Sequence, residues 1–261
     1  MLSIIIPVHN GQRSIAKTLE DYRLYFTSEY DGDFEIVVIP NGCTDETTRI
    51  VNKYLVNFPH QVHSSEFKDR MGKGGAVIEG FKMARGDVVA FVDADGAVGP
   101  GELHKLIIEL QDVDGVIGSK WACGSKPLVS QPIHRRIAGR GFNLLVRLMF
   151  DLPFKDTQCG AKVFRKRAID RVLPQLQVRN FAFDVELLHR LKKSGYKLKE
   201  VPVTWEDKDA SSVNMRKVIP GMFLSVARLR LSTSASERFA TKRVWYYMHN
   251  SIWGNVYNRL R

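Results

Sequence analysis

Short apolar runs that alternate with helical patterns constrain the fold of this 261-residue chain more than any other feature of its sequence. Four runs rich in Val and Ile lack strict polar alternation and end at turn residues, as strands buried on both faces do. They are Leu2–Val8, Phe34–Ile39, Val88–Val92 and Gly115–Ile117. Helical patterns separate or follow them, over Ser14–Thr27, Asp45–Phe58, Gly75–Ala84 and Gly101–Leu110. This order predicts an α/β fold with a mostly parallel central sheet and helices on both faces.

The second half of the chain is expected to be more helical. Its helices are predicted at Arg135–Phe150, Phe183–Lys193 and Val218–Leu231, with short strands at Lys162–Phe164 and Lys197–Val201. Beyond residue 215 the sequence becomes basic and aromatic. We therefore expect one α/β domain over residues 1–215 and a helical, basic C-terminal extension over residues 216–261.

The formal net charge of +11 is concentrated in two segments. Six Lys or Arg and no acid occur from Ser119 to Phe150, and nine basic residues accompany the single Glu237 from Arg216 to Arg261. Local charge of this kind indicates an anionic partner surface, such as phosphate groups or lipid head groups. A nucleic-acid partner is not expected, because no recognised nucleic-acid-binding motif is present.

The sequence offers few signs of export or membrane insertion. The apolar run at the N-terminus is too short for a signal sequence and lacks basic residues before it. No stretch approaches the ~18 to 20 apolar residues of a membrane-spanning helix. The three cysteines, Cys43, Cys123 and Cys159, are far apart, which favours a reducing compartment. We expect a cytoplasmic protein.

The candidate catalytic centre is the triplet Asp93-Ala94-Asp95, which follows directly after a predicted buried strand. Ligands of doubly wound sheets bind at the carboxyl ends of the strands. Two hard carboxylates at this spacing suit Mg²⁺ or Mn²⁺ shared with a diphosphate. The alternative is an acidic turn that caps the next helix. Gly96 lets the backbone approach a ligand closely, which favours the metal site.

A glycine-rich segment, Gly72-Lys73-Gly74-Gly75, comes shortly before a predicted helix. Backbone N–H groups at a helix N-terminus and the Lys73 charge favour an anion. The segment matches neither the P-loop nor the dinucleotide-binding fingerprint. By itself it is an ordinary turn, and beside Asp93 and Asp95 it becomes a candidate nucleotide contact.

Taken together, these motifs resemble the family 2 glycosyltransferases with a GT-A fold. The resemblance covers Leu2 to Val203 and rests on the order of several motifs: Ile4-Ile5-Ile6-Pro7-Val8-His9-Asn10, Asn41-Gly42-Cys43-Thr44-Asp45, Gly72-Lys73-Gly74-Gly75-Ala76 and Asp93-Ala94-Asp95. Further motifs resemble the dolichyl-phosphate glucosyl- and mannosyltransferase branch: Gly118-Ser119-Lys120, Asp156-Thr157-Gln158-Cys159-Gly160 and Phe183-Asp184-Val185-Glu186.

The resemblance implies a nucleotide-sugar donor and assigns residues to it. Pro7 and His9 would line the base pocket, with Asn41 and Lys73 nearby. Asp93 would hold the ribose and the water shell of the metal, and Asp95 would ligate the metal. The chain departs from the family pattern at Asn10-Gly11-Gln12, at Pro40-Asn41 and at Ala210-Ser211-Ser212. The donor, of the UDP-glucose or GDP-mannose type, and the acceptor contacts are therefore left open.

The implied acceptor is a polyprenyl (dolichyl) phosphate. A hydroxyl acceptor needs a general base, whereas a phosphate is already ionised at neutral pH and needs cations to hold it. The acid-free segment supplies such cations, although any one of them can equally belong to a solvated helix face. We assign Lys120, Arg135, Arg140 and Gln158 to acceptor binding, and Arg136 to catalysis beside Asp93 and Asp95.

Several alternatives remain at this level. A family 2 enzyme acting on a hydroxyl of a glycan or glycolipid would need a base, for which Asp156, Asp184 and Glu186 are the candidates. A relative that only binds nucleotide-sugars is also compatible with the motifs. The C-terminal extension is interpreted as an interfacial anchor on the cytoplasmic face of a membrane, or as a helix packed on the core.

Overall fold

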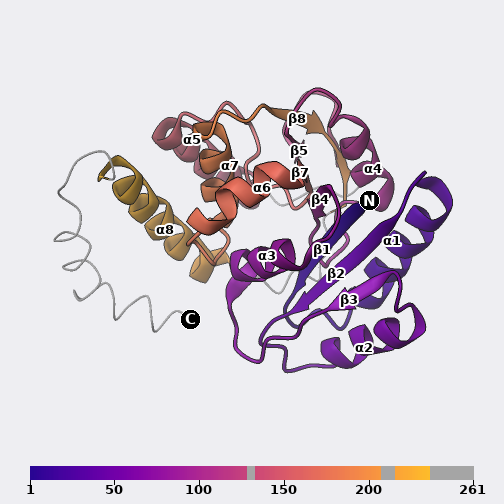
Figure 1. The fold of residues 1–261 in the computed structure, drawn as a ribbon. Helices are drawn as coiled ribbons and strands as arrows, with labels where there is room; N and C mark the ends of the chain where they lie inside the picture. The colour runs from indigo at the N-terminus through magenta and orange to yellow at the C-terminus, as the bar shows by residue number, and fades with distance from the viewer. Residues whose placement is uncertain (128–132, 207–214, 236–261) are drawn as a thin grey trace.

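The strongest apolar runs form the centre of one twisted sheet. The computed structural model describes residues 1–127, 133–206 and 215–235, and of residues 127, 133–138, 215–220 and 232–235 it describes the backbone alone. Seven strands pair in the order β3-β2-β1-β4-β7-β5-β8 (Figure 1). Their bounds are β1 (Leu2–Val8), β2 (Phe34–Pro40), β3 (Val62–Ser64), β4 (Val88–Phe91), β5 (Gly115–Ser119), β7 (Lys162–Arg165) and β8 (Leu198–Pro202). A second, two-stranded sheet joins β6 (Lys126–Pro127) to β9 (Thr204–Trp205).

Helices cover both faces of the sheet (Figure 1). They are α1 (Ile15–Glu29), α2 (Thr47–Asn57), α3 (Gly72–Met83), α4 (Pro100–Ile108), α5 (Ile133–Phe150), α6 (Lys166–Val172), α7 (Phe183–Lys193) and α8 (Met215–Ala235), with a 3₁₀ turn at Leu173–Gln175. Successive residues of β1 point to opposite faces. Ile5 therefore packs with the helices on the α3 and α7 side, whereas Ile4 and Ile6 pack with α1, α2 and α4. The predicted fold class is confirmed.

One strand runs against the others. β7 pairs antiparallel with both β4 and β5, while every other pairing in the large sheet is parallel. Its first residue, Lys162, lies opposite Phe91 and Ile117, close to where β4 and β5 end. The loop that precedes β7 is therefore delivered to the edge of the sheet where parallel strands have their carboxyl ends.

The predicted elements differ from the observed ones in two main respects. The shortest elements, β3, β6, β9 and α6, were not predicted, because two to seven residues carry little periodicity. The expected glycine-rich loop ahead of a helix at Gly75 is wrong, because α3 begins at Gly72. A Cβ at Gly74 would overlap the Phe183 side chain and lie 2.7 Å from the Val178 carbonyl oxygen. The glycine thus permits close packing of α3 on the segment before α7.

The described part of the C-terminal extension packs on the main domain. On α8, Val226 and Leu229 are buried in the same core cluster as α3 and α7, and Asn180 Nδ2 donates a hydrogen bond to Ser225 Oγ at 2.8 Å. Residues 236–261 of the predicted extension lie outside the described residues. Among the helices that the structure describes, none combines the length and apolar character needed to cross a membrane.

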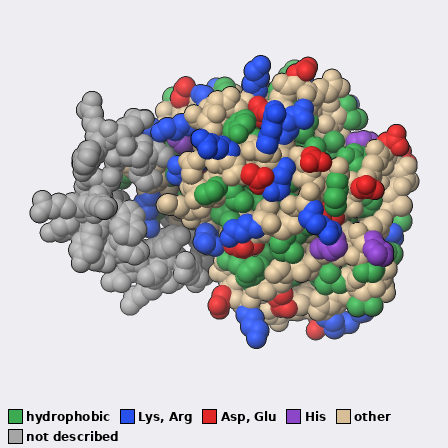
Figure 2. Space-filling view, viewed as in Figure 1, with side chains coloured by type: hydrophobic (Ala, Val, Ile, Leu, Met, Phe, Trp, Pro, Cys, Tyr) green, Lys and Arg blue, Asp and Glu red, His purple; other side chains and the backbone are tan. Residues whose placement is uncertain are grey.

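Charged side chains of both signs are interspersed on the face of the molecule shown in Figure 2. Lys and Arg lie among Asp and Glu there, so the basic surplus of the sequence does not form one broad patch at the centre of that face. The acid-free segment from Ser119 to Phe150 instead places its basic residues around β5, β6 and α5.

Candidate active site

The candidate site lies at the carboxyl ends of β1, β2 and β4. β1 is the middle strand of this group and pairs in parallel register with β2 and β4. The residues that follow these strands, His9, Asn41 and Asp93, are therefore brought to the same edge of the sheet. The rule that ligands of doubly wound sheets bind there located these residues correctly from sequence.

The predicted base pocket is organised around Asn41. The side-chain Nδ2 of Asn41 donates a hydrogen bond to the Val8 backbone carbonyl at 2.9 Å. The backbone carbonyl oxygen of Asn41 lies 2.9 Å from His9 Nδ1. Asn41 is 2% exposed, and its Oδ1 has no hydrogen-bond partner in the described part of the chain. A buried acceptor without a donor is costly. Asn41 is thus equipped to accept an N–H group of a ligand, and Pro7 is buried two residues before His9 in β1.

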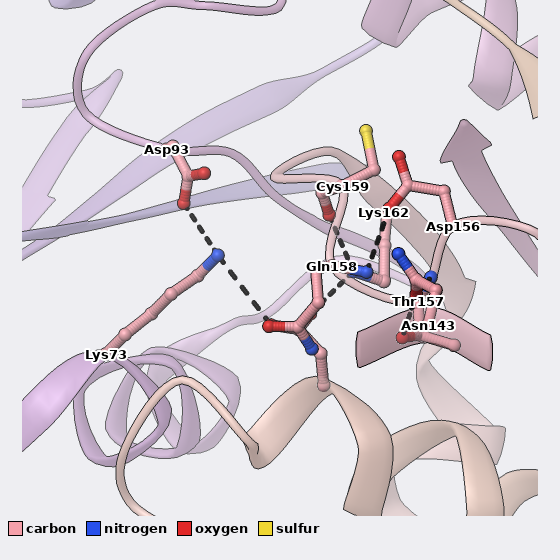
Figure 3. A network of polar contacts seen from close by, with 9 residues as sticks. Lys73, Asp93, Asn143, Asp156, Thr157, Gln158, Cys159 and Lys162 are labelled. Atoms are coloured by element: carbon pink, nitrogen blue, oxygen red, sulfur yellow. Dashed lines mark hydrogen bonds and ion pairs between the residues drawn. The ribbon is translucent and has the colours of Figure 1, made fainter. Parts of the chain in front are cut away.

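A chain of alternating charges extends inward from Asp93 (Figure 3). Lys73 Nζ lies 2.8 Å from Asp93 Oδ1 and 3.7 Å from Asp184 Oδ2. Asp184 Oδ1 in turn accepts a hydrogen bond from Lys162 Nζ at 2.5 Å. Asp184 and Lys162 are almost fully buried, and only a tenth of the Lys73 side chain is exposed. Buried charges require partners of this kind, so these four side chains hold one another in place.

The electrostatic environment shifts the pKa values of the two carboxyls of the triplet in opposite directions. Burial favours a higher pKa for Asp93, but the ammonium groups of Lys73, Lys120 and Lys162 together outweigh it and hold the pKa below its usual range. Burial and the Asp93 charge together raise the pKa of Asp95. Asp95 Oδ1 accepts the Ala97 N–H at 2.9 Å. Asp95 is therefore a carboxylate whose charged form would be stabilised by an added cation.

The donor set fits a divalent cation that completes its coordination with a ligand. Among the described residues, no group of three or more His, Cys, Asp and Glu side chains comes together as a metal site. Mg²⁺ is commonly held by one or two carboxylates together with substrate phosphates. Asp93 and Asp95 match that pattern, and a cation beside Asp95 would oppose the rise of its pKa that burial and the Asp93 charge cause.

The loop before β7 closes the site beside Asp93. Gly160 is so near that a Cβ there would overlap the Asp93 carboxylate, so only glycine fits. Lys162 Nζ donates to the Cys159 carbonyl at 2.6 Å and also lies over the Phe91 ring. Lys162 therefore fixes the same loop that confines Asp93.

The same loop is tied to α5 and to the end of β5. Asp156 accepts the Lys120 N–H at 2.9 Å and the Gln158 N–H at 3.1 Å. Asn143 Oδ1, on α5, accepts both the N–H and the hydroxyl of Thr157, at 3.0 and 2.8 Å. Figure 3 shows Asn143 and Thr157 side by side. The loop thus joins the donor side of the site to the basic segment.

Among the predicted acceptor residues, Gln158 lies in this loop, and the Lys120 ammonium is close enough to Asp93 and Asp95 to act towards a lower pKa at both carboxyls. Lys120 Nζ is 4.7 Å from the Trp205 ring centre, and Arg140 lies 5.0 Å from that of Trp121. Gln158 Nε2 is buried without a hydrogen-bond partner in the described part of the chain. Arg135 and Arg136 fall in the first turn of α5, but their side chains lie outside the described residues, as does the segment Ala210-Ser211-Ser212. Their assigned roles stay predictions.

Sequence comparison places this arrangement in a known family. Residues 3–173 match the family described as "Glycosyl transferase family 2". The chain belongs to glycosyl transferase family 2. The resemblance inferred from the motifs is thereby confirmed.

Curated relatives within family 2 point to one branch. The chain is 31% identical over 240 residues to a dolichyl-phosphate beta-glucosyltransferase of Dictyostelium discoideum, covering 88% of this chain and 73% of the relative. It is 30% identical to the enzyme of the same name from Saccharomyces cerevisiae, covering 81% and 69%. It is also 30% identical over 93% of its length to glycosyltransferase AglD of Haloferax volcanii, of which it spans only 39%.

Solved structures of two other proteins share the fold. Glucosyl-3-phosphoglycerate synthase from Mycobacterium tuberculosis, in complex with Mn²⁺, UDP and phosphoglyceric acid, superposes with a TM-score of 0.61 at 15% identity, covering 89% of this chain and 78% of that one. Residues 1–349 of Staphylococcus aureus TarS give a TM-score of 0.56 at 18% identity, covering 88% and 64%. At this identity the likeness supports the GT-A fold alone.

The three carboxylates weighed as general bases all have structural partners in this family 2 site. Asp184 lies between two ammonium groups, and Asp156 accepts backbone N–H groups on both oxygens. Glu186 is fully buried and accepts the N–H groups of Gln177 and Val178 at 2.9 and 2.7 Å, while its other oxygen pairs with Arg190. All three are thus held by structural partners, and burial raises the pKa of the Asp156 carboxyl, so their assignment as general bases stays an alternative prediction.

Lys162 is the principal site residue that sequence reasoning missed. It begins a four-residue strand that also ends on a charged residue, Arg165, and charged side chains at strand ends are usually solvated. Its partner Asp184 comes 22 positions later and from a helix. The available signal was the pair of acids in Phe183-Asp184-Val185-Glu186, both of which lie on the first turn of a buried helix.

Proposed function

We propose that this chain is an inverting, metal-dependent transferase that moves a hexose from a nucleotide-sugar to a polyprenyl (dolichyl) phosphate. The names of the curated relatives support glucose as the sugar. The observation that carries the phosphate acceptor is the engagement of Asp156, Asp184 and Glu186 by structural partners beside a site that offers cations. A monophosphate is a nucleophile without help from a base, whereas a hydroxyl is not.

The donor is assigned to the strand-end half of the site. Asn41 Oδ1 and the His9 ring would receive the base, and the Asp93 and Asp95 carboxylates would hold Mg²⁺ or Mn²⁺. That cation, when bound, would neutralise the charge on the leaving nucleoside diphosphate. Lys73 keeps the Asp93 carboxylate ionised and oriented. A direct in-line displacement at the anomeric carbon would invert its configuration.

The acceptor is assigned to the other side of the loop before β7. Lys120, Arg135 and Arg140 would hold the phosphate, with Gln158 as a further hydrogen-bond donor and Arg136 beside the reacting oxygen. Cationic groups recognise phosphate through strong charge-assisted hydrogen bonds. Such an acceptor is borne by a lipid, so we further propose that the protein works at the cytoplasmic face of a membrane, which the basic residues of the extension 216–261 contact.

The decisive experiment offers the protein labelled UDP-glucose, UDP-N-acetylglucosamine and GDP-mannose, each with and without polyprenyl phosphate. We expect label from UDP-glucose in an acid-labile lipid fraction, only when the lipid phosphate and a divalent cation are present. Label on a protein or a free glycan would refute the phosphate acceptor. Binding of a donor without any transfer would instead identify a catalytically silent relative.

A further inference from the structure

Helix α5 has a solvent-exposed apolar stripe that the proposed reaction does not use. Leu144 is 55% exposed and Leu148 is 76% exposed. Residues four positions apart lie on the same face of a helix. Buried positions such as Asn143, Val146 and Phe150 lie on another side of the helix, where they meet the loop before β7 and the core. The stripe is therefore the exposed apolar face of an amphipathic helix whose other side packs on the core.

The same face is basic. Arg140 and Arg147 are exposed and lie next to the two leucines, both on the same side of them around the helix axis. At about 100° per residue, Arg140, Leu144, Arg147 and Leu148 fall within an arc of about 100° around the helix axis. No acid occurs from Ser119 to Phe150, and the first one beyond, Asp151, pairs with Lys192 at 2.9 Å. Leucines bordered by arginines are typical of helices that lie in a membrane interface.

We propose that Arg140, Leu144, Arg147 and Leu148 on α5 form a docking face for an anionic lipid bilayer. The charge of the face is complementary to anionic head groups, and the leucines are placed to enter the acyl boundary. This inference rests on the proposed function for its purpose: α5 is joined through Asn143 to the loop that carries Gln158. A bilayer on this face would bring a lipid-borne phosphate to the acceptor side of the site.

The face differs from the other exposed apolar residues of the described chain. Leu24 and Ile108 are 52% and 56% exposed on α1 and α4, which cover the opposite face of the sheet. They match Leu144 in exposure and both α5 leucines in size, although Leu148 is more exposed, and they belong to different helices. They therefore provide a control pair that tests the position of the leucines and not surface hydrophobicity in general.

The test measures co-sedimentation of the full chain with vesicles of phosphatidylcholine alone or with 30% phosphatidylserine. We expect binding to the anionic vesicles, weakened at least about tenfold in Leu144→Ser/Leu148→Ser and about fivefold in Arg147→Gln. The control Leu24→Ser/Ile108→Ser should bind like the wild type. Undiminished binding of the α5 double variant, or loss of binding only in the control, would overturn the proposal.

Two further readouts separate this proposal from the reaction itself. Transfer to a short-chain, detergent-dispersed polyprenyl phosphate should be unchanged in Leu144→Ser/Leu148→Ser, whereas transfer to the same phosphate in anionic vesicles should fall with binding. Vesicle binding without any transfer would refute the proposed function and leave the docking face standing. If sedimentation velocity shows instead that the α5 leucines hold two copies of the chain together, the docking face is refuted.

Discussion

The proposed donor half and the proposed acceptor half of the site differ in how their charged side chains are held. The donor half stands on the ends of buried strands, and its charges are locked in the series Asp93, Lys73, Asp184, Lys162. The acceptor half relies on Lys120 and Arg140 laid over tryptophan rings, beside an exposed helix. A fixed geometry suits the stabilisation of charge on a leaving diphosphate. The Lys120 and Arg140 side chains, which pack against tryptophan rings, suit a phosphate head group that is attached to a long lipid.

The largest effect is expected from removing the Asp95 carboxylate of the proposed donor half. Asp95→Ala should reduce transfer by at least about a hundredfold, because preorganised groups at the developing charge contribute most to such rates. The melting temperature should stay near that of the wild type. Asp87→Ala, at a fully exposed side chain, is the matched control and should keep full turnover. Unchanged turnover in Asp95→Ala would contradict the assignment.

The locked charges predict a large loss of stability from a single change. Lys162→Met leaves Asp184 buried without its main partner and should lower the free energy of unfolding by about 3–5 kcal/mol. Lys166→Met, at a partly exposed Lys of the adjoining helix, should cost less than about 1 kcal/mol. Urea unfolding measures both.

A double variant distinguishes a charge pair from ordinary packing. Lys162→Met with Asp184→Asn should lose less stability than the sum of the two single variants, because neither charge is left alone. Strict additivity would show that the two side chains do not act as a pair.

The acceptor half should respond in affinity more than in stability. Lys120→Met is expected to raise the KM for polyprenyl phosphate about tenfold, the effect of a lost charge-assisted hydrogen bond, with a smaller change in the KM for the donor. Lys120→Arg should recover most of the loss. Lys126→Met, in the same acid-free segment, serves as the control. Equal effects on both substrates would place Lys120 in the donor half.

The smallest effect is expected where α5 meets α7. Burial, together with nearby cations such as Lys193, lowers the pKa of His189 from 6.5 to about 4, and its ring packs against Phe150. The folded protein favours the neutral ring, so the unfolded chain binds the extra proton between pH 6.5 and 4, and stability falls as the pH falls through that window. His189→Gln should flatten this part of the profile of melting temperature against pH. The exposed His60→Gln should not.

The sequence predicted the donor half better than the rest. β1 is buried on both faces, so its continuous apolar run identifies it, and Asp93 and Asp95 follow from their place after β4. The direction of β7 was not predictable, because a four-residue strand has the same pattern in either direction. The pairing of Lys162 with Asp184 joins a strand to a distant helix, and local patterns do not record such contacts.

Glycines in the sequence were the least reliable indicators of a ligand-binding loop. The segment from Gly72 to Gly75 reads as an anion-binding loop, yet Gly74 serves the packing of α3 against Phe183. Gly160 lies directly against Asp93, and its motif, Asp156-Thr157-Gln158-Cys159-Gly160, marks the segment without showing this contact. A glycine that permits close approach looks the same in sequence whether the approaching group is a ligand or another part of the chain.

The central claim, that the acceptor is a phosphate and needs no base, is tested most directly by a competition. Labelled UDP-glucose is supplied with equal amounts of a polyprenyl phosphate and the polyprenol of the same chain length. The account predicts label in the phosphate lipid alone, because Asp156, Asp184 and Glu186 are all engaged by structural partners. Label in the polyprenol at a comparable rate would contradict it, since that reaction requires a base.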